Sequence, residues 1–329
     1  YNIKYDGKTI VNCDDDLADR VWKAAKDFFV SVGVYHQESH RVIKFTEEEV
    51  NEVLYTKRPC YMIGAGHDQR WLRVRSVEDK EKRPFHLFSP DANFSSDIHK
   101  KACMAYLKEP LLDGLCAPLI EDFMGRKATS QTPTEVAAAM EHAMNLRDAQ
   151  RLVGKPDVWT VSVGTAETDQ AQIAAANKEW GVRPSHLDGR MVSILTEMTT
   201  NNAMLNKSMH YRAYGNVFGN LCGAIYGGHA GGAEGTLVLQ TAYNIEGACL
   251  LDPAGHSTSP SISNGSRRLQ ERYCGSRAYS ARQCQGIQTL YSSTTFSPTQ
   301  DPQLSSFTGN AQTTLLQRNL QAETRGEQR

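Results

Sequence analysis

Hydrophobic residues recur at intervals of three and four positions in several segments, and this spacing predicts amphipathic helices. The first runs through residues 17–32, behind the acidic cap Asp14-Asp15-Asp16. A second opens at Thr46-x-x-Glu49, which is a capping-box pattern. Two further helices are predicted at residues 97–107 and 134–152.

Short apolar runs that end in glycine lie between the predicted helices, as is typical of buried parallel strands that enter loops. They cover residues 60–66, 157–164 and 223–228, and a β-branched run at 40–45 predicts one more strand. The alternation of strand, glycine loop and helix favours an α/β fold with a parallel sheet. In a closed barrel of this class, functional side chains lie just beyond the strand ends.

The composition changes near residue 252. From Pro253 to Arg329 there is no Lys, Val, Met or Trp, and Ser, Thr, Gln and Arg dominate. So few large aliphatic side chains cannot offset the entropy of ordering the segment. We therefore predict a helical section at 1–59, an α/β part at 60–252 and a polar, disordered tail at 253–329. A reading-frame error or an unrelated fusion would leave the same composition.

Charge and composition exclude several classes of protein. The chain has 36 Lys+Arg against 37 Asp+Glu, which argues against a nucleic-acid partner. Apolar runs are far shorter than the roughly 20 residues of a membrane helix, so no membrane partner is expected. The N-terminus has no signal-peptide pattern, and the missing initial Met indicates a fragment. The eight scattered cysteines favour thiols in a reducing cytoplasm over disulfides or zinc.

The segment 227–236 carries the most informative chemistry. Its glycines permit unusual dihedral angles and close approach to the backbone, and Glu234 follows them at a predicted helix start. The segment matches neither the lysine-containing phosphate loop nor Gly-x-Gly-x-x-Gly. A tight turn followed by an ordinary first-turn acid is an equally good interpretation. The glycines of interest are Gly227, Gly228, Gly231 and Gly232.

Two further carboxylates follow or interrupt apolar runs. Glu167 comes just after the predicted strand 157–164, and Glu197 lies among apolar neighbours. Together with Glu234, they could hold a cationic amine or exchange protons with it. A solvated loop acid is the alternative for Glu167, and a surface position is the alternative for Glu197.

Histidines give a weaker signal. His36 and His40 have the spacing that places two imidazoles on one helical face, but they fall in a predicted loop and no third ligand follows, so we predict no metal site. His67, His210 and His229 are further polar candidates. Each is more readily explained as a structural residue.

At these same residues the chain resembles the monomethylamine methyltransferase family, the corrinoid-dependent enzymes of methylamine-using methanogens. The similarity consists of ordered motifs from about residue 1 to about residue 252. The motifs are Val32-Gly33-Val34-Tyr35, residues 40–49, residues 63–68, residues 74–80, Thr134-Glu135-Val136, Glu167-Thr168, His210-Tyr211 and the glycine-rich run to Glu234.

The resemblance implies a TIM (β/α)8-type barrel, here incomplete, that moves a methyl group from monomethylamine to the cobalt of a partner corrinoid protein. It implies no cofactor bound directly by this chain, since the partner carries the corrinoid. Glu234, Glu197 and Glu167 become amine-binding or proton-transfer groups, and the four glycines shape the opening through which the corrinoid approaches. We also expect a homo-oligomer.

In the family, a pyrrolysine binds the amine through an electrophilic ring imine. Its position falls at or near His186, within a stretch that departs from the family pattern. Histidine has no such imine and cannot form the same adduct. A relative that acts on another methylated amine, a translation that lost the special residue and a decayed copy are all compatible with this. A non-catalytic scaffold that keeps only the docking face is the alternative function.

Overall fold

The computed structural model describes residues 1–9, 12, 14–56, 60–73, 85–88, 90, 92–161, 168–175, 188–195, 197–213, 217–221 and 224–251. Their contacts divide the chain into two compact units. The first contains the described residues of Tyr1–Gly64, Gln69–Phe85 and Arg183–Leu290. The second contains those of Ala65–Asp68 and His86–Val182.

Helix α1 (Asp15–Val32) begins the first unit where the sequence predicts it. The Asp14 carboxylate accepts hydrogen bonds from the backbone N–H groups of Asp16 and Leu17 and so caps the helix. The helix ends at Gly33, whose φ of 72° is left-handed. A Cβ there would lie 2.4 Å from the Ile43 carbonyl oxygen, so the position requires glycine.

Helix α2 (Glu47–Thr56) confirms the predicted capping box. Thr46 N–H donates to Glu49 Oε2 at 2.8 Å, and Glu49 N–H donates to Thr46 Oγ1 at 3.2 Å. The Lys44 ammonium, between α1 and α2 in sequence, donates to the last carbonyls of α1, at Ser31 and Val32. A cation at this end of a helix satisfies carbonyls that have no partner within the helix.

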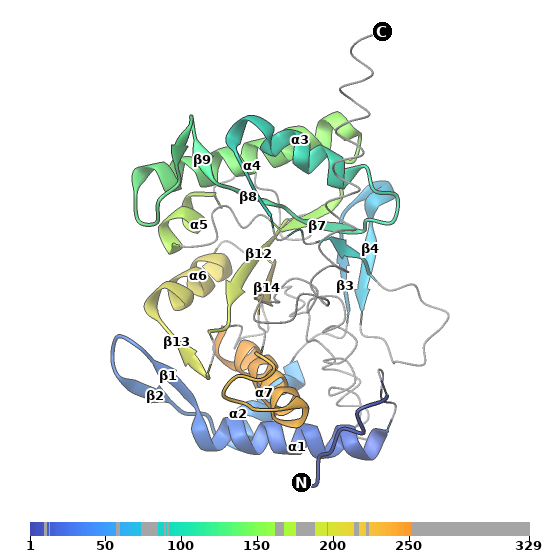
Figure 1. Cartoon of the computed structure of the whole chain (residues 1–329), viewed down its shortest axis with the longest axis vertical. Coiled ribbons are helices and arrows are strands. Elements are labelled where there is room, and N and C mark those ends of the chain that lie inside the picture. Colours follow the sequence, from blue (N-terminus) through green and yellow to red (C-terminus); the bar gives the residue numbers. More distant parts are fainter. Residues whose placement is uncertain are drawn as a thin grey trace. The chain divides into compact units, whose positions relative to one another are not determined.

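The two helices pack with the C-terminal part of the described chain. Figure 1 shows α1 alongside α7 (Ala233–Glu246), and α2 contacts the π-helix η3 (Gly247–Leu251) that follows α7. Ala18 and Val21 of α1 are buried against Leu237 and Val238 of α7. The packing therefore joins segments more than 200 residues apart in sequence.

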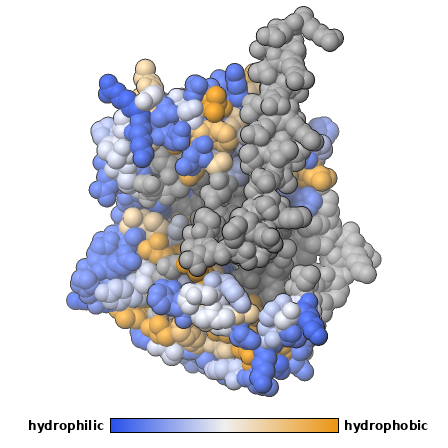
Figure 2. Space-filling view, in the orientation of Figure 1, coloured by the Kyte–Doolittle hydropathy of each residue, from blue (hydrophilic) through white to orange (hydrophobic). Residues whose placement is uncertain are grey.

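A hairpin and a short parallel strand form a small sheet in the first unit. Strand β1 (Val34–His36) pairs antiparallel with β2 (Arg41–Ile43) and parallel with β13 (Thr199–Thr200). Strand β2 confirms the run predicted at 40–45. In the space-filling view, hydrophilic residues predominate on the visible surface of this hairpin (Figure 2), in agreement with the exposure of Glu38, Ser39 and His40.

The pairing predicted for residues 60–66 is wrong. Strand β3 (Cys60–Ile63) pairs antiparallel with β4 (Arg70–Arg73) and does not enter a parallel sheet there. Gly64 and Gly66 have φ values of 72° and 50°, which allow the chain to reverse into the 3-10 turn η1 (Gly66–Asp68). The sequence of a strand that ends in glycine does not show whether the chain goes on to a parallel neighbour or reverses into an antiparallel hairpin.

The first unit also contains a parallel strand pair. Strand β12 (Asp188–Ser193) runs parallel to β14 (Val217–Leu221), with Gly189 opposite Val217 and Ser193 opposite Leu221. Helix α6 (Asn202–Ala213) lies between them in sequence and contacts both. The strand predicted at 223–228 is wrong, because β14 ends earlier and, among the described residues, 224–225 have no regular structure and 226–230 form turns.

The second unit is built on a three-stranded parallel ladder. Strand β7 pairs with both β5 and β11, and helices α3 and α4 pack on one another. The helices confirm the predictions at 97–107 and 134–152, and α4 ends at Gly154 in the left-handed conformation. The elements are β5 (Leu87–Phe88), β6 (Asn93–Phe94), α3 (Ser96–Leu107), β7 (Gly114–Cys116), β8 (Leu119–Ile120), β9 (Asp122–Phe123), β10 (Arg126–Lys127), α4 (Pro133–Val153), β11 (Trp159–Val161) and α5 (Asp169–Ala175).

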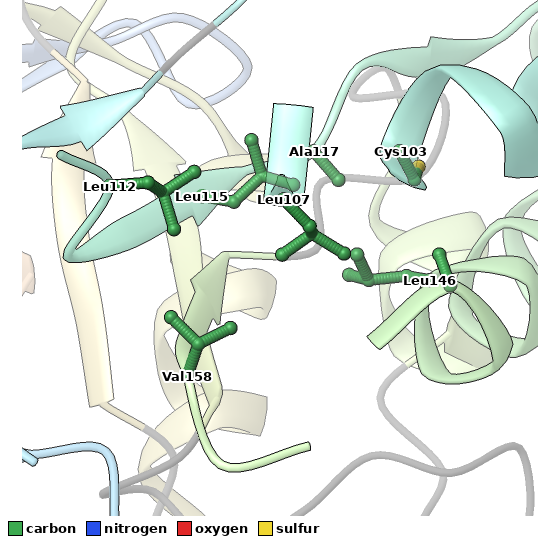
Figure 3. Packing of buried hydrophobic residues seen from close by; sticks show 8 residues of the cluster. Cys103, Leu107, Leu112, Leu115, Ala117, Leu146 and Val158 are labelled. Atoms are coloured by element: carbon green, nitrogen blue, oxygen red, sulfur yellow. The ribbon is translucent and has the colours of Figure 1, made fainter. Parts of the chain in front are cut away.

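Side chains from α3, α4 and the strands form the core of the second unit (Figure 3). Leu107, Leu115 and Leu146 are fully buried in it. The fold class is therefore α/β, as the sequence predicts. The described strands form open ladders, and no closed barrel is found among them.

Candidate functional site

The strongest candidate site lies where β12 and β14 end. Because the two strands are parallel, their carboxyl ends meet at the same edge of the ladder, where α/β proteins commonly place functional groups. Glu197 follows β12 by four residues, and the glycine-rich segment follows β14. The Glu197 carboxylate Oε1 lies 3.0 Å from Nδ1 of His229.

The backbone at Glu197 is strained. Glu197 and Met198 have φ values of 64° and 54°, and both therefore lie in the left-handed region that disfavours residues other than glycine. Leu195 and Thr199 form an antiparallel bridge across this turn. Strain of this kind clusters at functional sites and persists only where the surroundings hold it.

Helix α7 holds the loops at both strand ends. The Tyr243 hydroxyl accepts the Glu197 N–H at 2.7 Å, and the Gln240 side-chain oxygen accepts the Ala224 N–H at 2.8 Å. Tyr243 is 1% exposed and Gln240 is 6% exposed. Because they are three positions apart, they lie on one face of the helix.

The glycine-rich segment forms a compact turn. Gly227 N–H donates to the Gly231 carbonyl, and both glycines have positive φ, at 80° and 77°. Gly228 and Gly232 do not have positive φ, so their backbone angles do not require glycine. A Cβ on Gly235, in the first turn of α7, would lie 1.9 Å from the Ala230 carbonyl oxygen. Gly235, which the sequence pattern did not single out, allows the turn to pack against the helix.

Glu234 is held away from this arrangement. Its Oε1 accepts the Tyr5 N–H at 2.9 Å, and this hydrogen bond lowers the pKa of the Glu234 carboxyl. Glu234 and Tyr243 are nine positions apart, so at 3.6 residues per turn they lie on opposite sides of α7. The structure brings Glu197 to the glycine-rich turn, but it does not bring Glu234 to the same face of the helix.

The other two predicted site residues, Glu167 and His186, lie outside the described residues. The neighbour of Glu167 is nevertheless well fixed. Thr168 donates from its N–H and hydroxyl to the buried Glu135 carboxylate, at 3.2 and 2.8 Å. The motifs Thr134-Glu135-Val136 and Glu167-Thr168, quoted above for the family resemblance, are therefore in direct contact.

Buried charges on β12 and α6 were not anticipated. Asp188 and Arg190 are at most 2% exposed, and they share a face of β12 because they are two positions apart. Lys207 of α6 is 2% exposed. Burial, followed by the charge of Arg190, lowers the pKa of His210 on the same helix. The available sequence signal was the spacing of Asp188 and Arg190, which places two charges on one side of a strand that continues into Met191 and Val192.

His36 and His40 make separate side-chain contacts. The Tyr35 hydroxyl bonds to His40 Nδ1 at 2.7 Å, whereas His36 contacts Ser39 and Asn202. Within the part of the chain that the structure describes, no group of three or more potential ligands could hold a metal ion.

Among the same described residues, no helix is long and apolar enough to cross a bilayer. Cys103, Cys116 and Cys249 are buried thiols that form no disulfide.

Fold and site together define an α/β protein with a carboxylate–imidazole pair beside a glycine-rich turn at the carboxyl ends of parallel strands. Comparison with known proteins gives the family. The model of the family "Monomethylamine methyltransferase MtmB" matches residues 1–291, and the chain belongs to this family. The match continues beyond residue 252, where the sequence predicted the end of the resemblance.

Curated relatives and solved structures agree with this. Monomethylamine methyltransferase MtmB1 of Methanosarcina barkeri is 25% identical over 260 residues, which cover 79% of this chain and 56% of the relative. MtmB2 of Methanosarcina acetivorans is also 25% identical over 260 residues, with the same coverage. The chain therefore spans about half the length of the curated relatives it matches.

Two crystal structures share the fold, that of the Methanosarcina barkeri monomethylamine methyltransferase and that of a hydroxylamine complex of MtmB. Each is 24% identical with a TM-score of 0.70, and the match covers 76% of this chain and 54% of the solved chain. At this identity, the likeness describes the fold alone.

Proposed function

We propose that the chain is a methyltransferase that takes the methyl group of monomethylamine, or of a related methylated amine, and transfers it to a corrinoid protein. The family assignment supports the reaction class. The observation that carries the proposal at this chain's own residues is the Glu197–His229 pair at the carboxyl edge of β12 and β14. An alkylammonium ion is a cation with N–H donors, and a carboxylate is the side chain that binds it best.

The pair has a defined polarity. A carboxylate can only accept hydrogen bonds, so the proton of the contact lies on Nδ1 of His229, which donates to Glu197. The side chain of Glu197 is 39% exposed and that of His229 is 84% exposed, so a small ligand can reach both. In our proposal, Glu197 binds the ammonium group and His229 orients the Glu197 carboxylate, so that the amine stays protonated and leaves as a neutral amine when the carbon–nitrogen bond is broken.

We propose that the chain binds no cofactor of its own and that the corrinoid, carried by the partner protein, supplies the nucleophile that accepts the methyl group. The glycine-rich turn fits a close approach. A Cβ at Gly227 or at Gly231 would meet no described atom within 4 Å, so the backbone is open there. Gly228 and Gly232 complete the same segment.

Three predicted residues complete the proposal. Glu167 serves as a further amine-binding carboxylate, and His186 marks the position of the family's electrophile. Glu234, which is bonded to Tyr5, supports the site through the first turn of α7. The family resemblance supports the first two assignments.

The remaining proposals concern the complete protein. We propose a (β/α)8-type barrel, supported by the parallel pairs β12–β14, β5–β7 and β7–β11 and by the fold match. We also propose a cytoplasmic homo-oligomer without a nucleic-acid partner. Light scattering at several concentrations tests the oligomeric state, and a single-subunit mass throughout would contradict it.

The test of function is transfer of radiolabel from mono-, di- and trimethylamine to a reduced corrinoid protein by the full chain. We expect transfer from monomethylamine, and we expect Glu197→Gln to lower kcat/KM by about 10- to 100-fold because a charge-assisted hydrogen bond contributes roughly 1.5–3 kcal/mol. Glu52→Gln, an exposed glutamate on α2, is the matched control and should leave the rate unchanged.

Two outcomes contradict the proposal. If the folded chain transfers label from none of the three amines, it is not this methyltransferase. Docking to the corrinoid protein without methylation would then fit a non-catalytic scaffold. If transfer occurs but Glu197→Gln behaves as Glu52→Gln does, the amine is bound elsewhere.

A further inference from the structure

The turn that presents Glu197 is held from two sides. Tyr35 N–H of β1 donates to the Met198 carbonyl at 2.8 Å, and the Tyr243 hydroxyl of α7 accepts the Glu197 N–H at 2.7 Å. Two consecutive left-handed residues other than glycine cost free energy, and such a conformation persists only where its surroundings compensate. Tyr243 provides the contact on the Glu197 side.

The direction of the Glu197 side chain depends on this conformation. A change from left-handed to right-handed backbone dihedrals moves Cβ and would carry the carboxylate away from His229, whose Nδ1 is now 3.0 Å from Oε1. Because the Tyr243 ring is 1% exposed, its hydroxyl is itself held in place by packing. A buried ring therefore fixes a half-exposed carboxylate.

Helix α7 anchors the second loop on the same face. Gln240 accepts the Ala224 N–H in the segment that leads to the glycine-rich turn, and Gln240 lies three positions before Tyr243. Within one helical turn, α7 thus anchors the loop that carries Glu197 and the loop that carries His229.

We propose that Tyr243 is a positioning residue: its hydroxyl holds the strained turn so that the Glu197 carboxylate meets His229. The effect on catalysis rests on the proposed function, whereas the effect on the Glu197–His229 pair does not. The substitution that isolates the hydroxyl is Tyr243→Phe, since the ring and its packing remain. Tyr106→Phe is the matched control, because Tyr106 is a partly buried tyrosine that packs in the second unit.

The first readout is NMR of ¹⁵N-labelled histidine. In the wild type we expect the neutral His229 ring to carry its proton on Nδ1, where it donates to Glu197. In Tyr243→Phe the signals of this one ring should shift toward the Nε2–H form that free imidazoles prefer, and in Tyr106→Phe they should not. Unchanged His229 signals in Tyr243→Phe would overturn the proposal.

The second readout is kinetic. With the amine-binding carboxylate misplaced, Tyr243→Phe should lower kcat/KM for methylamine by about 5- to 30-fold, chiefly through KM, as expected for the loss of 1–2 kcal/mol. Wild-type kinetics in Tyr243→Phe, in a chain that does transfer methyl groups, would refute the positioning role. A shift of the His229 signals without methyl transfer by any variant would refute the proposed function and keep the positioning role.

A third variant covers the case in which Tyr243→Phe folds poorly. Glu197→Gly removes the penalty of the left-handed residue, so the turn no longer needs the hydroxyl. The loss of Tm caused by Tyr243→Phe should therefore be smaller in the Glu197→Gly background than in the wild type. Equal losses in both backgrounds would show that Tyr243 stabilises the core without holding this turn.

Discussion

Glu246, at the end of α7, makes the stability of the protein depend on pH in a way that one substitution should remove. Its side chain is 1% exposed, and its Oε2 has no hydrogen-bond partner among the described residues. Burial raises the pKa of this carboxyl from 4.5 to about 8. The folded protein therefore keeps Glu246 protonated at neutral pH, whereas the unfolded chain ionises it.

The direction and size of the effect follow from proton linkage. Below pH 4.5 the group is protonated in both states, and its contribution to stability is fully present. Between that pH and about 8, the native state holds one more proton than the unfolded state, so stability falls by about 1.4 kcal/mol per pH unit. Above about pH 8 both states are ionised and the loss, on the order of 5 kcal/mol, levels off.

Urea unfolding of the wild type and of Glu246→Gln at pH 5, 6, 7, 8 and 9 measures this contribution. Other titrating groups act on both proteins, so the difference between the two free energies of unfolding isolates Glu246. We expect this difference to change in favour of Glu246→Gln by about 1 kcal/mol or more per unit between pH 5 and 8. Parallel profiles would refute the reasoning, and Glu52→Gln should show them.

Three further outcomes follow from contacts in the structure. Gly235→Ala should lower the free energy of unfolding by about 1–3 kcal/mol in urea titration, because its Cβ would lie 1.9 Å from the Ala230 carbonyl oxygen, whereas Gly227→Ala should cost only about 1 kcal/mol through its φ of 80°. Glu135→Gln should cost about 1–3 kcal/mol, since an amide cannot accept from both Thr168 groups and from Gln131 N–H as the carboxylate does. Burial raises the pKa of the Cys103 thiol to about 12, so peptide mapping after iodoacetamide treatment should find Cys103 unmodified in the native protein and alkylated in urea.

The sequence predicted best the elements whose signals are local. Asp14 caps α1 and the Thr46–Glu49 box opens α2, because a capping hydrogen bond joins residues two or three positions apart. Helices α3 and α4 follow their apolar periodicity for the same reason. Each of these elements carries its own start and stop signals.

The errors occurred where glycine had two possible meanings. The run at 60–66 turns back into β4, and residues 226–230 form turns after β14 has ended. In both cases an apolar stretch next to glycine resembled a strand that enters a parallel sheet. The positive φ at Gly64 and Gly227 decides the outcome, and tertiary context sets it.

The site could be predicted only in part, because its contacts are long-range. Glu197 was identified as a candidate, but its backbone is bonded to Tyr243, 46 positions later. His229 was noted without a partner. Tyr243 went unnoticed, although a tyrosine on a helix face that is otherwise buried must find a hydrogen-bond partner for its hydroxyl.

Helix α7 explains why stability and site geometry should respond to different substitutions. One face carries Glu234, Leu237 and Val238, which contact the N-terminal segment and α1. Tyr243, on the side opposite Glu234, and Gln240, one turn earlier, hold the loops beyond β12 and β14. Glu197 and Met198 have the positive φ that residues other than glycine avoid. Tyr243, which belongs to helix α7 and not to the loop, compensates for this strain. Because a glycine would adopt these dihedral angles at less cost, a glutamate held there by a buried helical tyrosine indicates that the turn is retained for its geometry.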